Sequence, residues 1–494
     1  MKQLLIGLIA TVLTFTFSAT TNAAAPAVVT INGQSAGPTP FISQLDLTVS
    51  QASALAGIEF MVEPKPGSAT RPVSASYSTA YLQSRGFFDT TNGQINLPVF
   101  GLYADYSNTV VLTYLFNKGS AQTASVTIPT AAFADPTGVY TNPTIVQARS
   151  LQTKDLSYDF VMLKQYASSN TPVIVDTDGE VRWVGTAGIA IFSSIFYDNA
   201  FYVASGTGLV RNELDGAFGF IADYSNLGVT TTGHHNYDPG KFGIILEVDT
   251  TNAIESVNIE IDRLGNVLKV WNVADIIRDA MIAGGDDPSA FVREPDDWFH
   301  NNATTYRKSD NTIIMSGRED FVIAFDYDTQ EIKWILGDSS KAWYQYPSLR
   351  QFAVTLGKDT LPPIGQHAVS ITKDNSLLLF DNGATSLNHT PPGTNRTYSA
   401  ARKYKIKSLK KPAREVWTYD RNQTINSPYC SSVYEDRAKN YLVTYSMGGP
   451  FVYTKLVGLS SKGAVVFEID YPAINGCGTA WNAIPIHLEN LVFE

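Results

Sequence analysis

The sequence predicts an all-β protein, a six-bladed β-propeller preceded by a small N-terminal β-sandwich. Short β-prone runs separated by Gly, Pro, Asn and Ser fill residues 24–135 without long helical periodicity. Residues 140–494 then repeat one pattern at nearly constant spacing. Aromatic residues make up 12% of the 494-residue chain and charged residues only 17%, a composition that excludes global disorder.

Residues 1–23 have the pattern of a secretory signal peptide. Lys2 precedes an apolar stretch that runs from Leu4 to Phe17, and small residues then lead to a cleavage point near Ala23. The alternative is an N-terminal membrane anchor. Since no later stretch is long and apolar enough to cross a bilayer, we expect an exported mature chain without a membrane span.

Residues 24–135 are predicted to form the β-sandwich. Runs of β-prone residues at 27–31, 110–114 and 124–128 recur at the spacing of sandwich strands. The pattern of the sequence changes over residues 136–142, so the propeller domain is predicted to begin at residue 140.

The propeller domain contains an internal repeat marked by histidine. His235, His300, His367 and Ser432 lie 65, 67 and 65 residues apart, and an apolar strand follows some ten residues after each of them. Weaker copies earlier in the chain bring the total to about six units. All-β units of regular length favour a propeller, in which four-stranded blades surround a central channel.

Each of these units is longer than the roughly 40–50 residues of a usual blade. The additional residues are expected in loops at 272–299, 335–364 and 384–398. The apolar strand after each key residue, such as residues 312–315 after His300, is predicted to be the inner strand of its blade.

Equivalent positions of successive blades converge on the propeller axis, so residues far apart in sequence are expected to meet there. Four of the six histidines, His234, His235, His300 and His367, fall at the corresponding place in the three clearest repeats. One histidine alone is usually structural, whereas three repeats with histidine at the same phase predict a histidine-lined channel. Ser432 holds the matching place in the next repeat and is expected to bind substrate.

Arg318 is the expected cationic partner of these histidines. It directly follows the predicted inner strand after His300, and it is therefore expected to point into the same channel. The alternative is a surface ion pair with Glu319 or Asp320. Guanidinium and amide donors beside imidazoles form an anion site, which suits oxygens whose charge grows during group transfer.

Three other functions are weaker interpretations of the sequence. A zinc site would use three histidines, but no short ligand spacing is present and Arg318 would repel a cation, so no metal is predicted. A carboxylate pair for glycoside hydrolysis would come from Glu294, Asp296 and Asp297, which are predicted to form a solvated cluster in a Pro-containing loop. The formal charge of −10 and the lack of a long basic run exclude nucleic acid as a partner.

Cys430 and Cys477 are the only cysteines. Both belong to the last repeat, and the mature chain is expected to be exported, so a disulfide between them is predicted. The alternative is two buried thiols.

Four motifs carry a family resemblance: Gly-His-His at 233–235, Asp-Trp-Phe-His-Asn-Asn at 297–302, Ser-Gly-Arg at 316–318 and Gly-Gln-His-Ala-Val at 365–369. In these motifs the chain resembles the bacterial arylsulfate sulfotransferases, exported propeller enzymes that move a sulfuryl group from one phenol to another without a nucleotide donor. The resemblance covers residues 140–494, and the small N-terminal sandwich also fits the family layout.

The resemblance implies a role for most residues of the expected cluster. His367 is the expected nucleophile, which becomes transiently sulfated, and His300 is the expected acid and base toward the phenolic oxygen. Asn302 and Arg318 are expected to hold the sulfuryl oxygens. A histidine of the 234–235 pair is expected to assist, and which of the two enters the site stays open.

The resemblance also implies a ping-pong reaction in the periplasm, with a small aryl sulfate donor, a phenolic acceptor, no metal and no cofactor. A homodimer is a further expectation from the family. One departure concerns a short-loop disulfide that better-known members carry shortly before the nucleophile, because this chain has no cysteine between Arg318 and His367. The alternative function is a non-catalytic propeller that binds another component of the cell envelope, since fold alone does not define function.

Overall fold

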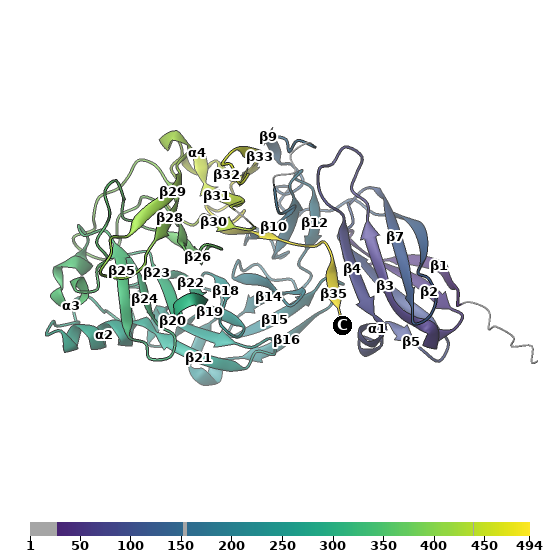
Figure 1. Ribbon diagram of the computed structural model, residues 1–494, viewed down its shortest axis with the longest axis horizontal. Helices are drawn as coiled ribbons and strands as arrows, with labels where there is room; N and C mark the ends of the chain where they lie inside the picture. The colour runs from purple at the N-terminus through teal and green to yellow at the C-terminus, as the bar shows by residue number, and fades with distance from the viewer. Residues whose placement is uncertain (1–26, 152–155, 438) are drawn as a thin grey trace, which may run out of the picture.

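The computed structural model describes residues 27–151, 156–437 and 439–494. The signal peptide predicted at residues 1–23 lies outside these described residues. Figure 1 shows two bodies side by side, a layered β domain that contains the N-terminal strands and a larger ring of sheets that contains most of the chain. The predicted all-β class with an N-terminal sandwich is confirmed.

Two sheets form the N-terminal sandwich. The first has the order β1 (Val29–Ala36), β2 (Ile42–Val49), β6 (Gln94–Phe100) and β5 (Phe88–Asp89). The second has the order β35 (Leu491–Phe493), β4 (Val73–Ser78), β3 (Leu55–Val62), β7 (Ser107–Phe116) and β8 (Gln122–Pro129). Buried and less buried residues alternate along β4 and most of β7, as expected for strands with one face on a core.

The C-terminal residues of the chain return to the sandwich. Strand β35, which the sequence analysis assigns to the propeller domain, pairs in parallel with β4, so that Leu491 faces Ala75. The sandwich core also includes Trp183 and Phe201 from the ring of sheets. The two domains therefore share one hydrophobic core and a strand.

Six antiparallel sheets make up the ring in the described part of the chain, and we number them 1–6 in chain order. Sheets 1 to 3 contain β10 (Phe160–Lys164), β11 (Val173–Asp176), β12 (Val181–Val184) and β34 (Asn482–Ile486); β13 (Ser194–Tyr197), β14 (Ala200–Ser205), β15 (Gly208–Glu213) and β16 (Phe218–Asp223); and β17 (Val229–Thr231), β18 (Tyr237–Pro239), β19 (Ile244–Thr250), β20 (Ala253–Ile261) and β21 (Val267–Asn272). Sheets 4 to 6 contain β22 (Asn301–Arg307), β23 (Thr312–Gly317), β24 (Phe321–Asp326) and β25 (Ile332–Gly337); β26 (His367–Ile371), β27 (Leu377–Asp381), β28 (Ala400–Lys405) and β29 (Arg414–Tyr419); and β30 (Ser432–Glu435), β31 (Tyr441–Met447), β32 (Tyr453–Leu459), β33 (Val465–Pro472) and β9 (Thr144–Gln147).

Six hydrophobic clusters join each sheet to the next and close the ring. Pairs that represent these clusters, from sheets 1 and 2 around to sheets 6 and 1, are Ile174 and Phe201, Tyr202 and Tyr237, Ile245 and Ile313, Ile314 and Val369, Leu378 and Val433, and Leu442 and Val161. Hydrogen bonds close the ring as well, because β34 completes sheet 1 beside β10 and β9 completes sheet 6 beside β33. The sheets are thus arranged around an axis, as blades of a propeller are.

The inner strands differ from those that the sequence analysis predicts. Strands β13, β18, β22, β26, β30 and β34 contact one another in turn, which places them next to the axis. The apolar residues 312–315 instead lie in β23, the second strand of sheet 4. Strand β22 is rich in Asn and Thr although its residues are mostly buried, so a search for apolar runs misses it.

Helices are few. They comprise α1 (Thr79–Ser84), α2 (Val273–Ala283), α3 (Pro347–Arg350) and α4 (Gly448–Phe451), with 3-10 helices at Ala52–Ala54, Ser225–Leu227, Lys308–Asp310, Ala342–Gln345 and Arg421–Gln423. Helices α2 and α3 lie in two of the predicted extra loops, and the Asn272 side chain caps α2 by accepting from the Ala274 amide at 2.9 Å. Among the described residues, no helix has the length and apolar character needed to cross a membrane.

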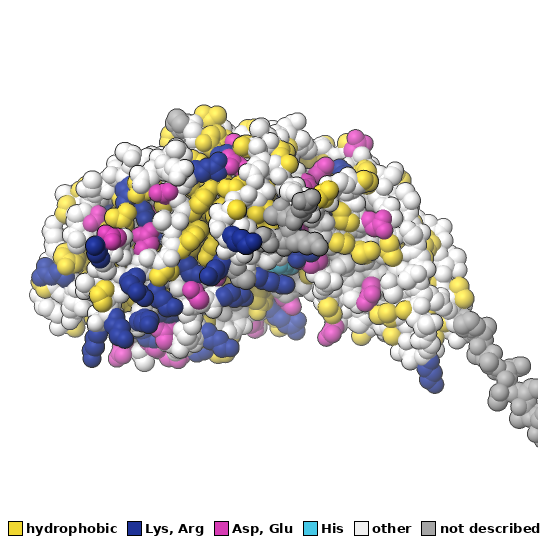
Figure 2. Space-filling view, turned by 45° about the horizontal axis from the view of Figure 1, so that its top comes forward, with side chains coloured by type: hydrophobic (Ala, Val, Ile, Leu, Met, Phe, Trp, Pro, Cys, Tyr) yellow, Lys and Arg dark blue, Asp and Glu magenta, His cyan; other side chains and the backbone are white. Residues whose placement is uncertain are grey.

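Charged side chains are unevenly distributed over the two domains. On the face drawn in Figure 2, Lys and Arg side chains gather on the ring of sheets and few lie on the sandwich. On this side the sandwich presents scattered Asp and Glu side chains among uncharged ones.

Cys430 and Cys477 form the predicted disulfide, with their Cα atoms 6.5 Å apart. We expect the double variant Cys430→Ser, Cys477→Ser to lose about 3–4 kcal/mol of the free energy of unfolding, because the bond closes a long loop in the unfolded chain. Urea unfolding with and without reductant measures this. Reductant should lower wild-type stability to that of the variant and leave the variant unchanged, and a variant as stable as wild type contradicts the prediction.

Candidate active site

Three histidines lie where the inner strands of sheets 3, 4 and 5 begin. His235 precedes β18, His300 directly precedes β22, and His367 is the first residue of β26. The ring centres of His235 and His300 are 4.8 Å apart. Trp481, just before β34, lies 5.2 Å from His235 and 5.9 Å from His367. The structure thus brings together three histidines that the repeat predicts to converge.

Hydrogen bonds determine the tautomer of His367. Its Nδ1 lies 2.8 Å from Asn382 Oδ1 and 3.1 Å from the Gly365 carbonyl oxygen. The Asn382 amide donates to the carbonyls of Ser427 and Cys430, which turns its oxygen toward the imidazole. Two acceptors therefore face Nδ1, so Nδ1 carries the hydrogen and Nε2 keeps its lone pair.

His367 stays neutral over a wide pH range. Burial and then the nearby Arg318 guanidinium lower the pKa of His367 to about 3, because both disfavour a positive charge on the ring. A neutral imidazole with a free Nε2 lone pair is a nucleophile.

The two residues before His367, Gly365 and Gln366, determine the backbone conformation at the start of β26. Gly365 has a φ of 60°, and a Cβ there would lie 2.7 Å from the Ala384 carbonyl oxygen, so only glycine fits. Asn302 donates from Nδ2 to the Gln366 carbonyl at 2.8 Å, and Gln366 donates to the Gly317 carbonyl at 2.8 Å. The predicted residue Asn302 thus joins sheet 4 to the start of β26, and its Oδ1 has no hydrogen-bond partner among the described residues.

Arg318 is buried beside the histidines, with only 2% of its surface exposed. Its backbone NH donates to the His300 carbonyl at 3.0 Å. The guanidinium pairs with Glu319 through Nη1 and lies 5.1 Å from the Tyr429 ring centre. The ion pair considered as an alternative exists, but it is buried, and Nη2 has no partner in the described part of the chain. One donor of the guanidinium therefore remains available for an anion.

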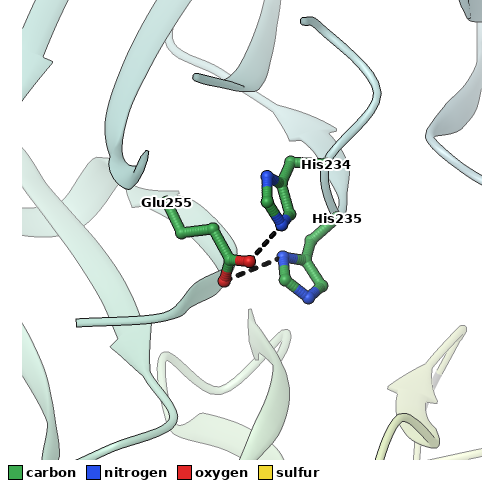
Figure 3. Close-up of side chains that lie close together, drawn as sticks. All are labelled: His234, His235 and Glu255. Atoms are coloured by element: carbon green, nitrogen blue, oxygen red, sulfur yellow. Dashed lines mark ion pairs between the residues drawn. The ribbon is translucent and has the colours of Figure 1, made fainter. Parts of the chain in front are cut away.

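Carboxylates surround His300 and His234, and the sequence analysis missed their role. His300 Nδ1 lies 2.7 Å from Glu255 Oε2 and 2.7 Å from Asp297 Oδ2. His234 Nδ1 lies 2.6 Å from Asp249 Oδ2, and its Nε2 bonds to Glu255. Figure 3 shows the Glu255 carboxylate facing both rings of the histidine pair.

The four histidines divide into two charged rings and two neutral rings. Burial acts to lower the pKa of His300 and of His234, but the carboxylates outweigh it and raise the values to about 9 and about 10. Burial lowers the pKa of His235 well below its usual value. At neutral pH the cluster therefore holds two cationic imidazoles beside the two neutral ones, His235 and His367.

The structure separates the two members of the histidine pair. His235 is the one next to His300 and Trp481. His234 stacks behind it at 4.7 Å and is held by Asp249 and Glu255. His235 is therefore the member of the pair that lies beside His300, and His234 lies behind it.

Other predicted or candidate residues lie outside this arrangement. The Ser432 hydroxyl donates to the Ala483 carbonyl at 3.2 Å and accepts from the Ala483 amide at 3.1 Å, so it fastens β30 to β34. His389 bonds to Asp320 and the Phe291 carbonyl. His487 bonds to Asp436 and Glu489.

An aromatic wall adjoins the cluster. Phe192 stacks on Trp481 at 5.1 Å, Tyr166 lies 5.4 Å from Phe192, and the disulfide packs against this group. A flat apolar wall beside cationic donors and a neutral nucleophile fits an anionic group attached to an aromatic ring.

Two sets of side chains in the cluster also offer metal-ligand atoms: His234, His235 and Glu255, and Glu255, Asp297 and His300. The nitrogen–oxygen separations at His300 are 2.7 Å. Ligands of one tetrahedral zinc ion stand about 3.3 Å apart, given bonds of about 2.0 Å. The nitrogen–oxygen separations at His300 are therefore shorter than those between ligands of one zinc ion, and they fit ion pairs between the imidazole and the two carboxylates.

Comparison with known proteins identifies matching families in both domains. The family described as "Arylsulfotransferase (ASST)" matches residues 145–475, and "Arylsulfotransferase Ig-like domain" matches residues 45–131. A protein of Escherichia coli O6:H1 named "Arylsulfate sulfotransferase AssT" is 24% identical over 373 residues, which cover 60% of each chain and so less than two thirds of that relative. A protein of the same name from Lelliottia amnigena is 21% identical over 496 residues, covering 77% of this chain and 79% of its own.

Proposed function

The chain belongs to the arylsulfotransferase family, and on this premise we propose that it moves a sulfuryl group from an aryl sulfate ester to a phenolic acceptor. The observation that carries the proposal is the state of His367, a buried imidazole whose Nδ1 is occupied by two acceptors and whose pKa is lowered to about 3. Such a ring presents a nucleophilic Nε2 at neutral pH without needing a base.

In the first half of the reaction, His367 Nε2 attacks the sulfur of the donor. A nitrogen–sulfur bond forms, the sulfur–oxygen bond to the aryl group breaks, and the phenolate oxygen takes a proton from cationic His300. The free Nη2 of Arg318 supports the proposal, because it can hold a sulfuryl oxygen as charge shifts onto it. The first phenol leaves before the acceptor binds.

In the second half, the acceptor phenol gives its proton to His300, which is now neutral. The phenolic oxygen attacks the sulfur, the nitrogen–sulfur bond breaks, and His367 returns to its neutral state. His300 is again protonated, so each cycle starts from the same enzyme. Two steps, each of which has a good leaving group, together replace one difficult transfer.

We further propose that the protein acts after export to the periplasm. The support is the pattern of residues 1–23 in the sequence. The steps above need no cofactor, and Phe192 and Trp481 offer the aryl group of either substrate a stacking surface.

Incubation with 4-nitrophenyl sulfate and phenol tests the proposed function. We expect release of yellow nitrophenolate and formation of phenyl sulfate, with double-reciprocal plots that are parallel at several phenol concentrations. Enzyme without acceptor should release at most one nitrophenolate per chain rapidly. No release with any of several phenols contradicts the proposal and favours a binding protein, whereas intersecting lines contradict the ping-pong sequence.

A further inference from the structure

The buried carboxylate of Glu255 connects three imidazoles of the cluster. Its oxygens form ion pairs with His234 Nε2 and His300 Nδ1, and Oε2 lies 3.6 Å from His235 Nδ1. Only 6% of the Glu255 side chain is exposed. No sequence motif pointed to this residue, because it comes from the middle of sheet 3, 20 positions after His235.

We propose that Glu255 is a positioning residue of the transfer reaction: it fixes the orientation of His300 and keeps this ring charged, so that His300 Nε2 delivers the proton to the departing phenolate. The inference rests on the proposed function and deepens it. Glu255 acts through His300 and does not touch the transferred group.

Contacts with two carboxylates assign the two nitrogens of His300. Nδ1 forms a hydrogen bond with Asp297 Oδ2 at 2.7 Å and an ion pair with Glu255 Oε2 at 2.7 Å. Both carboxylates are acceptors only, so Nδ1 carries the hydrogen. Nε2 is then the nitrogen left to exchange a proton with substrate. The side chain of Asp297 is 30% exposed, whereas that of Glu255 is buried. Solvent therefore weakens the attraction between Asp297 and the His300 ring more than the attraction between Glu255 and this ring.

The backbone at Glu255 supports a functional role. Glu255 lies in β20 with a φ of 49°, in the left-handed region that a residue with a Cβ rarely adopts. Its amide donates to Asp249 Oδ1 at 2.8 Å, which holds this conformation. The local break in the strand turns the carboxylate toward the axis. His300, which the carboxylate contacts, also has a positive φ, of 55°.

Three carboxylates face the two cationic rings of the cluster, and Glu255 is the one that contacts both rings. Asp249, Glu255 and Asp297 face the cationic rings of His234 and His300. The remaining groups near His300 are the neutral imidazoles of His235 and His367 and the Arg318 guanidinium, none of which stabilises a positive charge. Removing the Glu255 charge therefore leaves Asp297 as the one anion that contacts His300 in the described residues.

The test is Glu255→Gln, which keeps the shape and removes the charge, assayed with phenyl sulfate and with 4-nitrophenyl sulfate. Nitrophenolate is a good leaving group that needs no proton, whereas phenolate needs one to leave. We therefore expect about a 100-fold loss of kcat/KM with phenyl sulfate and less than about a 5-fold loss with 4-nitrophenyl sulfate. With phenyl sulfate, the alkaline fall of the rate should move to lower pH by about one unit or more, because a lost anion lowers the pKa of His300.

Two further variants separate positioning from stability. Glu255→Asp keeps the charge and is expected to recover part of the phenyl sulfate rate. Glu468→Gln removes another buried carboxylate, which pairs with Lys455 and lies in sheet 6, so it is expected to lower the melting temperature without changing the pH profile. Equal losses with both donors and an unmoved alkaline fall in Glu255→Gln overturn the proposal.

Chelation distinguishes a hydrogen-bonding carboxylate from a metal ligand. Wild-type enzyme treated with EDTA is expected to keep its pH profile with both donors. If EDTA reproduces the behaviour of Glu255→Gln and added zinc reverses it, Glu255 is a ligand and the proposal is wrong. Transfer from 4-nitrophenyl sulfate by wild-type enzyme tests the proposed function independently of all these outcomes.

Discussion

Replacement of His367 by Ala is expected to lower transfer at least about 1,000-fold, because it removes the atom that carries the sulfuryl group between donor and acceptor. The same substitution should abolish a covalent intermediate. Wild-type enzyme mixed with aryl sulfate alone and quenched at high pH should yield one peptide with an added sulfuryl group, located at His367. Peptide mass spectrometry measures this directly.

His487→Ala is the matched control for this experiment. His487 bonds to Asp436 and Glu489 outside the cluster, so the variant should keep both turnover and the adduct at His367. Full turnover by His367→Ala, or an adduct on a different residue of the wild-type enzyme, means that His367 is not the nucleophile. Because the pKa of His367 is about 3, the adduct should form as readily at pH 6 as at pH 7.

Arg318→Lys is expected to reduce turnover about 100-fold or more, which is the usual cost of losing one donor to the developing charge. Lysine keeps the charge near Glu319, but it lacks the planar guanidinium whose Nη2 is free while Nη1 holds Glu319. The loss should appear in kcat with both donors, because the sulfuryl oxygens are common to them. Steady-state kinetics together with a melting curve checks this.

Arg182→Lys is the control for burial. Arg182 is 1% exposed and pairs with Asp176 in sheet 1, away from the histidines. Both variants are expected to melt at lower temperature, and only Arg318→Lys should lose specific activity. An Arg318→Lys protein that melts far lower yet keeps normal activity when folded shows that Arg318 has a structural role.

The histidine cluster was predictable because the repeat carries positional information. His235, His300 and His367 stand at the same phase of a β repeat, and that phase alone places them on one end of a closed ring. The sandwich and the disulfide follow from equally local signals, the alternation of β-prone runs and the position of the only two cysteines. Strand β22 was missed, because a buried polar strand shows no apolar run.

What the sequence determined by itself is therefore the all-β class, the two domains and the convergence of three histidines, because each depends on a pattern that repeats along the chain. Only the tertiary structure decided their chemistry. His300 and His367 are equivalent in the repeat, yet the pKa of one is raised and that of the other is lowered. The difference comes from Glu255 and Asp297 beside the first, and from burial and Arg318 at the second. Electrostatic effects depend on distance in space, and distances between sheets are not recorded in sequence order.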